Sequence, residues 1–215
     1  MIKVGLNIGN SKISCAVSEI EKNKKIKLLS FQSFQSNIIR KNIITNFDEL
    51  SNDIRSLISE SEKKSQTKIN SVNLNIPMID SLSRYYDFEI ENLDQQITDL
   101  DIKKVINKSE YFNVDDDYYQ IFNKINGYVL DGNLIQNTPV GNYANKLKVL
   151  FYKILIPYKN IQSYKNVIES QNISIESLVP TPLSSALATL SNDEKNIGTI
   201  CIDLGHSNTS ISIFE

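Results

Sequence analysis

The sequence is poor in the residues on which several large classes of enzyme depend. It holds a single histidine, His206, so zinc sites built from histidines and Ser-His-Asp triads have little material, and we expect His206 to act only as a hydrogen-bond donor in a loop. The two cysteines, Cys15 and Cys201, lie in strand-like segments without the second ligand pair of a metal site. We therefore expect both thiols to be small, buried apolar residues.

An excess of positive charge is also missing, as is any long apolar run. The net charge is −2 at pH 7, whereas nucleic-acid binding requires a concentrated basic face, so no nucleic-acid partner is expected. The basic cluster at 22–27 lies between two strand-like runs, which indicates a solvated turn. No apolar run reaches the roughly 18 residues of a membrane span, and no signal peptide precedes Met1. We therefore expect a cytoplasmic protein with no membrane anchor within this chain.

The pattern of apolar residues predicts an α/β protein. With 215 residues, of which 40% are hydrophobic, the chain can bury a core and form one or two domains. Alternating apolar positions predict strands, and a stripe at Leu50, Ile54, Leu57, Ile58 and Ser61 predicts an amphipathic helix. The order expected at the start of the chain is strands at 2–7, 11–19 and 26–34, a helix at about 47–64, and a strand at 72–76.

The middle of the chain, from Pro77 to about Pro157, follows a pattern of its own. Residues 98–101 resemble a capping box that starts a helix, and strands are expected at 119–124, 127–130 and 146–156, which together make a small α+β module. Beyond Pro157 we expect a helix with Ile161, Tyr164, Val167 and Ile168 on one face and a strand at 173–179. A second helix follows, with Thr181 as its N-cap and Pro182 at its first position.

One phrase occurs twice, near the two ends of the chain. Residues 6–11, Leu-Asn-Ile-Gly-Asn-Ser, return at 202–207 as Ile-Asp-Leu-Gly-His-Ser, and each copy is a strand that breaks at a glycine before another apolar strand. A glycine at that point permits a backbone approach that a Cβ would block. The short polar residues after it favour an anion-binding nest of backbone N–H groups.

Two such hairpins facing each other would hold a polyphosphate from both sides, although each copy alone also fits a plain hairpin turn. Asn7 and Asp203 end their strands at the same point, where an oxygen could hold a hydrated divalent cation. The residues expected to bind nucleotide phosphates are Asn7, Gly9, Asn10, Ser11, Lys12, Asp203, Gly205, Ser207, Asn208 and Thr209.

In this order the elements resemble the actin-like ATPase superfamily and, within it, the FtsA family of bacterial cell-division proteins. The resemblance rests on residues 4–13, which are similar to the first phosphate loop, and on 202–205, which are similar to the second. It also rests on 40–46 before the first helix, on 126–132 and 137–141 in the insertion, and on 181–186. The expected fold is therefore the first, ribonuclease-H-like lobe of an actin-like protein.

The resemblance implies a division of the chain into four segments. Residues 1–76 and 158–197 correspond to subdomain 1A, 77–157 to the inserted FtsA-type 1C (SHS2-like) domain, and 198–215 to the first hairpin of subdomain 2A. It implies ATP and Mg²⁺ as cofactors, with Asn7 and Asp203 near the metal, and self-association and contacts with other division proteins through the inserted domain. The second lobe, which in the family holds the adenosine pocket, the docking surface for FtsZ and the membrane anchor, lies outside the 215 residues.

Several positions depart from the family pattern. Asn7 stands where the family usually has a carboxylate, Ser210 stands where an acid is usual, and His206, Ser207 and Asn208 replace a glycine-rich run. Lys12 could neutralise a phosphate oxygen or be an exposed strand lysine. Asp203 is the best candidate for a catalytic base or metal-water ligand, and it equally fits a turn former. The acidic run 115–117 is expected to be a solvated turn, because adjacent side chains point in different directions.

We therefore expect a non-enzymatic or weakly ATP-binding scaffold of cell division at the inner face of the membrane. The alternatives are an actin-like ATPase whose nucleotide cycle controls polymerisation, and a related actin homologue of pilus assembly or cell shape. The last hairpin carries Ile200, Ile202, Leu204, Ile211, Ile213 and Phe214. An uncovered apolar hairpin is a docking or aggregation surface, so we expect either further chain or a partner to cover it.

Overall fold

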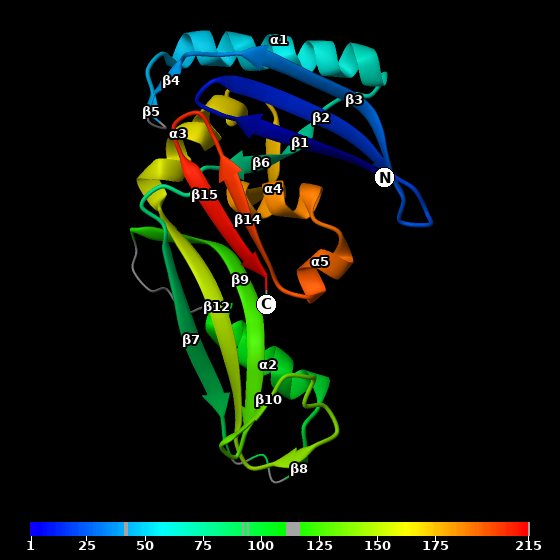
Figure 1. Cartoon of the computed structure of the whole chain (residues 1–215), viewed down its shortest axis with the longest axis vertical. Helices are drawn as coiled ribbons and strands as arrows, with labels where there is room; N and C mark the ends of the chain where they lie inside the picture. The colour runs from blue at the N-terminus through cyan, green and yellow to red at the C-terminus, as the bar shows by residue number, and fades with distance from the viewer. Residues whose placement is uncertain (41–42, 92, 94, 111–116, 215) are drawn as a thin grey trace. The chain divides into compact units, whose positions relative to one another are not determined.

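The structure is a computed structural model that describes residues 1–40, 43–91, 93, 95–110 and 117–214. The chain divides into two compact units, Met1–Ile79 with Lys159–Glu215, and Asp80–Tyr158 (Figure 1). The insertion expected at 77–157 coincides with the second unit apart from a few residues at its ends. Its correspondence to the FtsA-type 1C domain stays a prediction.

The first unit is built on a five-stranded sheet in the order β13-β6-β1-β2-β3. β1 pairs in parallel with β6, and β6 with β13, whereas β2 and β3 complete an antiparallel meander from β1. The strand positions predicted from alternation are confirmed. Their bounds are β1 (Ile2–Ile8), β2 (Lys12–Ile20), β3 (Ile26–Gln35), β6 (Ser71–Ile76) and β13 (Ser174–Pro180), with a short pair β4 (Ile39–Arg40) and β5 (Ile43–Ile44).

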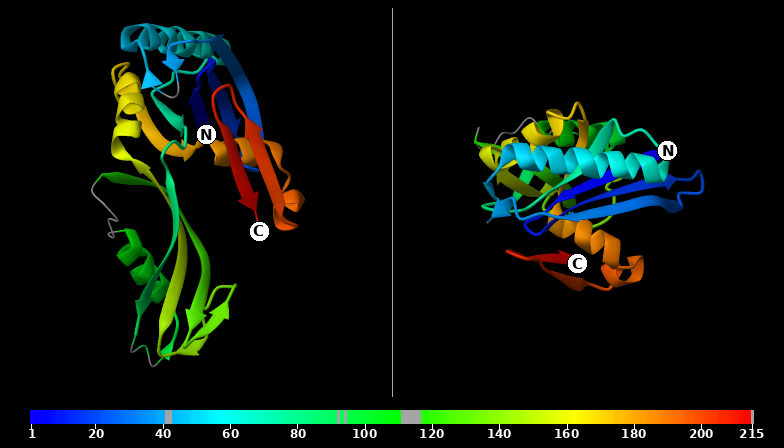
Figure 2. Two further views of the ribbon diagram at one scale, coloured as in Figure 1. Left: turned by 60° about the vertical axis from the view of Figure 1, so that its left-hand side comes forward. Right: turned by 90° about the horizontal axis from the view of Figure 1, so that it is seen from above.

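Helix α1 (Phe47–Ser65) packs on β2 and β3 (Figure 2). It begins at Asn46, whose side chain accepts a hydrogen bond from the Glu49 backbone N–H, and it ends at Gln66 in the left-handed conformation. The predicted stripe of five residues is its buried face. Helix α3 (Tyr158–Glu169) likewise buries Ile161, Tyr164, Val167 and Ile168, as predicted.

The chain ends with α4 (Thr181–Thr189), α5 (Asn192–Asn196) and the hairpin of β14 (Thr199–Leu204) and β15 (Thr209–Phe214). The prediction that Thr181 caps α4 is wrong. Pro180, the last residue of β13, occupies the N-cap, and its side chain has no group that could accept a cap hydrogen bond. The burial expected of Cys201 is also wrong: its side chain is half-buried, because it lies on a two-stranded sheet.

The second unit is an antiparallel sheet in the order β10-β9-β12-β7 with α2 (Asp99–Glu110) packed on one face. Its core contains Ile102 and Val105 of α2 and Leu147, Val149 and Phe151 of β12. The strands are β7 (Leu82–Ile90), β9 (Tyr118–Leu130), β10 (Asn133–Ile135) and β12 (Leu147–Pro157), with a separate pair β8 (Gln95–Gln96) and β11 (Tyr143–Ala144).

Two details of the second unit bear on the sequence predictions. The capping box is confirmed, since Asp101 Oδ2 accepts hydrogen bonds from both the backbone N–H and the hydroxyl of Thr98. These bonds, with one from Lys104, lower the pKa of Asp101 to about 2. The two strands expected at 119–124 and 127–130 form one strand, β9, because a register shift beside Asn126 lets the pairing with β12 continue through the glycine.

Candidate phosphate-binding cleft

The two copies of the repeated phrase form hairpins with the same turn. The Gly9 N–H donates to the Lys12 carbonyl at 3.0 Å, and the Gly205 N–H donates to the Asn208 carbonyl at 2.9 Å. The strand registers also agree, because Asn7 lies opposite Ser14 and Asp203 lies opposite Ser210. The sequence repeat is therefore a repeat of backbone geometry.

The turns require glycine because of close contact rather than an unusual φ angle. A Cβ at Gly9 would lie 3.0 Å from the Lys12 carbonyl oxygen, and one at Gly205 would lie 2.8 Å from the Asn208 carbonyl oxygen. Both distances are shorter than ordinary van der Waals contact. The predicted reason for the glycines, an approach that a Cβ would block, is confirmed.

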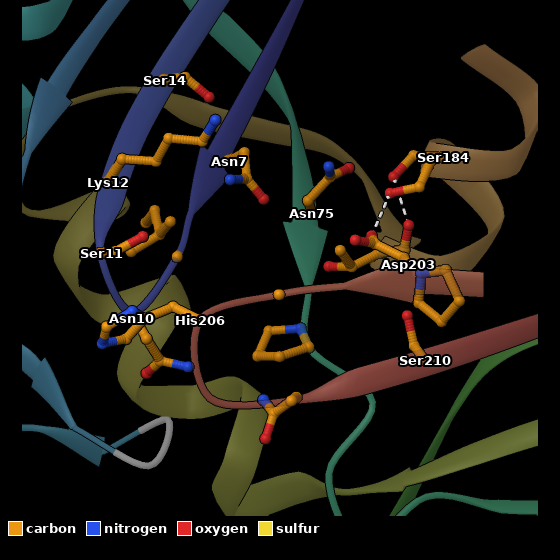
Figure 3. A pocket seen from close by; sticks show the side chains of 18 of the residues that line it. Asn7, Asn10, Ser11, Lys12, Ser14, Asn75, Ser184, Asp203, His206 and Ser210 are labelled. Atoms are coloured by element: carbon orange, nitrogen blue, oxygen red, sulfur yellow. Dashed lines mark hydrogen bonds between the residues drawn. The ribbon is translucent and has the colours of Figure 1, made fainter. Parts of the chain in front are cut away.

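A cleft of about 980 Å³ lies between the two hairpins (Figure 3). The parallel strands β1, β6 and β13 all end at its edge, which is where ligands usually bind in open α/β sheets. Its polar lining comes from both hairpins, the end of β6 and helix α4: Asn7, Asn10, Ser11, Lys12, Ser14, Asn75, Thr181, Ser184, Ser185, Thr189, Asp203, His206, Ser207, Asn208 and Ser210.

Nine of the ten residues predicted to bind phosphate line the cleft: Asn7, Gly9, Asn10, Ser11, Lys12, Asp203, Gly205, Ser207 and Asn208. Thr209 is not among the lining residues. It pairs with Leu204, and both side chains are exposed on the other side of the hairpin. The two-residue period of a strand accounts for the difference, since Ser210, one position further, faces the cleft. The role of these residues in binding phosphate stays a prediction.

Asp203 is tied to helix α4. The Ser185 hydroxyl donates to Asp203 Oδ2 at 2.7 Å, and the Ser212 hydroxyl of β15 donates to the Pro182 carbonyl at 2.8 Å. The start of α4 therefore fixes the second hairpin at two points. Ser185 also orients one oxygen of the Asp203 carboxylate, which leaves the other oxygen for a ligand.

The sequence prediction did not include Ser14, Asn75, Ser184 or Ser185 among the site residues, yet all four line the cleft. Asn75 lies beside Asn7 in the parallel pairing of β1 with β6. Two signals point to these residues. Ser14 shares strand parity with Lys12, and Asn75 ends a strand parallel to the one that Asn7 ends. The serines of α4 carry no such signal, because helix packing alone explains small residues.

The charged side chains described in the cleft lining are Lys12 and Asp203. Lys12 is exposed and belongs to the lining, and the His206 ring lies on the second turn (Figure 3). Mg²⁺ is usually held by one or two carboxylates together with the phosphates. This lining offers one carboxylate, with one oxygen already accepting from Ser185, so it matches Mg²⁺ less well than the resemblance implies.

The motifs of the insertion lie in the second unit. Asp131 and Gly132 form the turn between β9 and β10, where the Asp131 carboxylate accepts hydrogen bonds from the backbone N–H groups of Asn145 and Lys146. The most distinctive stretch of the resemblance therefore closes a turn of the second unit. Positions 41–42, 115 and 116, which the sequence predictions also named, lie outside the described residues.

The comparisons with known proteins agree with the resemblance. No protein-family model matches the chain. Curated proteins do: the cell division protein FtsA of Neisseria meningitidis serogroup B is 25% identical over 209 residues, covering 97% of this chain and 50% of that protein. FtsA of Buchnera aphidicola subsp. Schizaphis graminum is 26% identical over 207 residues, covering 94% of this chain and 48% of that protein. The similarity to FtsA extends over nearly the whole length of this chain. The chain spans about half the length of the FtsA proteins it matches.

The solved structures show an actin-like fold. A PilM-PilN type IV pilus biogenesis complex superposes with a TM-score of 0.66 and 12% identity, covering 98% of this chain and 57% of that chain. The ethanolamine utilization protein EutJ from Carboxydothermus hydrogenoformans superposes with a TM-score of 0.53 and 12% identity, covering 100% of this chain and 48% of that chain. The predicted fold class is confirmed. Among the described residues, none of the helices combines the length and apolar character needed to cross a membrane.

Proposed function

We propose that this FtsA-like chain belongs to an actin-fold adaptor of bacterial cell division, which self-associates and recruits other division proteins at the cytoplasmic face of the membrane. The observation that carries the proposal is the match to FtsA proteins over 97% of the chain. Cell division is the process for which those relatives are named. The adaptor role, the division-site location and FtsZ as a partner of the complete protein are parts of the proposal.

The cleft supports weak binding of nucleotide phosphates as part of this function. Two matched glycine turns, each followed by short polar residues, line one cleft, and Lys12 is among the lining residues. Against tight binding, Asn7 is neutral and the residues of the second turn, 205–208, are exposed. An exposed turn is held in place by few contacts with the rest of the protein, so its groups are less well positioned for a ligand. We therefore expect nucleotide to bind weakly.

Self-association is proposed to use the second unit. Tyr85 of β7 is 70% exposed and packs against Tyr152 of β12, with ring centroids 5.2 Å apart. Exposed tyrosines contribute large contact areas at protein interfaces with little loss of side-chain entropy. Beside this pair, Lys148 forms ion pairs with Asp87 and Glu89, so the charges of this sheet face are largely neutralised within the sheet.

Hydrogen exchange measured as a function of protein concentration tests this assignment. The proposal expects sedimentation velocity to show concentration-dependent self-association, with new amide protection confined to β7 and β12. Tyr85→Ser is expected to weaken self-association, whereas Tyr143→Ser, a tyrosine 76% exposed on β11, is the matched control. Protection confined to the first unit would contradict the assignment.

Recovery of partners by affinity capture tests the cellular role. The full-length protein encoded at this locus, tagged and recovered from its own host, is expected to retain FtsZ and other division proteins. Recovery of pilus-assembly or cell-shape components in place of division proteins would contradict this proposal. It would favour an actin homologue that acts in pilus assembly or cell shape.

An actin-like ATPase is the second candidate function, and the hydrogen bond from Ser185 to Asp203 favours it. A carboxylate held in one orientation beside two turns that we propose bind anions is what a base or metal-water ligand in phosphoryl transfer requires. Binding of labelled ATP with magnesium, followed by phosphate release, separates the two functions. Turnover that Asp203→Ala abolishes and Asp193→Ala, an exposed residue of α5, preserves would establish the ATPase and reject an adaptor without catalysis.

A further inference from the structure

The polar part of the cleft lining consists largely of amide and hydroxyl groups, which can donate hydrogen bonds. The amide side chains come from Asn7, Asn10, Asn75 and Asn208, and hydroxyls come from both hairpins and from α4. The positive charge of Lys12 is matched by the negative charge of Asp203, so the charged side chains described in the lining sum to about zero. A neutral cleft rich in donors can accept phosphate oxygens directly.

Asn7 occupies the position in β1 that Asp203 occupies in β14. Both lie two residues before the glycine of their turn, and both lie opposite a serine. A Cβ at Gly9 would lie 3.5 Å from Asn7 Nδ2, which shows that the amide nitrogen is close to the first turn. An amide nitrogen donates to a phosphate oxygen, whereas a carboxylate at this position would repel the phosphate unless a cation lay between them.

Asn75 also favours direct contact with phosphate oxygens. It is the neighbour of Asn7 across the parallel pairing of β1 with β6, so two amides lie side by side at the edge of the sheet. The one carboxylate in the described lining, Asp203, is already engaged by the Ser185 hydroxyl at 2.7 Å. The first hairpin and β6 therefore offer amide donors and the cation Lys12, and the carboxylate lies on the second hairpin.

We infer that the cleft binds the phosphate groups of a nucleoside di- or triphosphate directly through Asn7, Asn75 and Lys12, without a divalent cation. This inference rests on the proposed phosphate-binding role of the two hairpins. It assigns Asn7 as the residue that allows phosphate to bind without a divalent cation.

Isothermal titration with ATP, and separately with inorganic pyrophosphate, tests the inference in magnesium and in excess EDTA. The expected dissociation constant for each ligand differs by less than about twofold between the two conditions. Asn7→Asp adds one negative charge without changing the size of the side chain. We expect it to weaken binding in EDTA by at least tenfold and magnesium to restore most of that loss.

Asn23→Asp is the matched control. Asn23 lies in the exposed turn between β2 and β3, and its Oδ1 accepts a hydrogen bond from the Lys25 backbone N–H, which a carboxylate can also do. Asn23→Asp adds the same charge outside the cleft, so this variant is expected to bind ATP and pyrophosphate as tightly as the parent chain in both buffers. The comparison of the parent chain with and without magnesium decides the question even if Asn7→Asp fails to fold.

The outcomes separate this inference from the function on which it rests. Binding of ATP in magnesium that disappears in EDTA would overturn the metal independence and leave the phosphate-binding cleft in place. Failure of both ligands to bind in either buffer would overturn both the inference and the phosphate-binding role, whereas the adaptor function would still depend on the capture of partners. Pyrophosphate binding equal to that of ATP supports the inference, because it places the contacts on the phosphates.

Discussion

The hairpins β1–β2 and β14–β15 have the same turn and opposite surroundings. Both place a glycine N–H on the carbonyl three residues later, and both alternate apolar side chains with polar ones that face the cleft. In the first hairpin the apolar face is buried, with Leu6 1% exposed and Ile13 fully buried. In the second, Ile202 is 58% and Ile211 59% exposed. The turn therefore depends on local sequence, whereas burial depends on what packs against the sheet.

The elements beside each hairpin explain this difference. The first hairpin forms the middle of a five-stranded sheet with α1 on the apolar face, whereas the second is a two-stranded sheet that meets α4 on its polar face. Leu6 and Ile202 occupy the same position of the repeat, so they form a natural pair for measuring how much the surroundings contribute.

The largest effect is expected from truncating that pair. Leu6→Ala should lower the free energy of unfolding by about 2–5 kcal/mol, because it leaves a cavity in a close-packed core. Ile202→Ala should lower it by less than about 1 kcal/mol, because the side chain already contacts solvent. Urea unfolding followed by circular dichroism measures both. Equal losses would show that the second hairpin is buried in solution, and a dependence of that loss on protein concentration would identify self-association as the cause.

The glycines of the two turns provide the next effect. Gly9→Ala should destabilise the protein by about 1–3 kcal/mol, because its Cβ presses on a backbone carbonyl within the central sheet. Gly205→Ala makes the closer contact, 2.8 Å against 3.0 Å, yet its turn is exposed and can open locally. We therefore expect a loss below about 1 kcal/mol, with faster amide exchange in 204–209.

Gly5→Ala is the control for the glycine pair. No atom lies within 4 Å of a Cβ at Gly5, so its stability should equal or slightly exceed that of the parent chain. If Gly205→Ala proved as destabilising as Gly9→Ala, the second turn would be as rigid as the first, and the contrast between the hairpins would not extend to their turns.

The fold could be predicted from the sequence where local pattern decides the structure. The stripe of α1, the capping box at Thr98 and the alternation in β1 and β2 follow from period and hydrogen-bonding chemistry, and all three are confirmed. β7 was not singled out, because its charged residues interrupt the apolar alternation and their ion pairs with Lys146 and Lys148 depend on a strand distant in sequence.

The residues of the two turns could be predicted from the sequence, whereas the lining residues of α4 could not. Asn7, Gly9, Asp203 and Gly205 belong to a repeat that is visible in the sequence, and all line the cleft. Ser185 reaches Asp203 across 18 positions of the chain through the packing of α4 on the hairpin, and no periodicity encodes that contact. Thr209 follows the second turn directly, but strand alternation puts its side chain on the face away from the cleft.

The two thiols extend the comparison to reactivity. Burial raises the pKa of the Cys15 thiol, and a side-chain hydrogen bond with Ser61 only partly opposes that shift. Because the thiolate is the nucleophile, and because Cys15 is fully buried, iodoacetamide should modify half-buried Cys201 at least tenfold faster. Mass spectrometry of Cys15→Ser and Cys201→Ser measures each thiol alone. Equal rates would mean that the first hairpin opens as readily as the second.

The smallest effect concerns the connection between α4 and the second hairpin. Ser185→Ala removes the hydroxyl that donates to Asp203 at 2.7 Å, in a setting that is only half-buried, so solvent can partly replace the lost hydrogen bond. We expect the global stability to change by less than about 1 kcal/mol, while amide exchange in β14 and β15 rises roughly fivefold. Ser184→Ala is the matched control, because the Ser184 hydroxyl donates to the Thr181 carbonyl within the same helix. If both variants raised exchange equally, the effect would come from fraying of α4, and Ser185 would have no specific role in holding the hairpin.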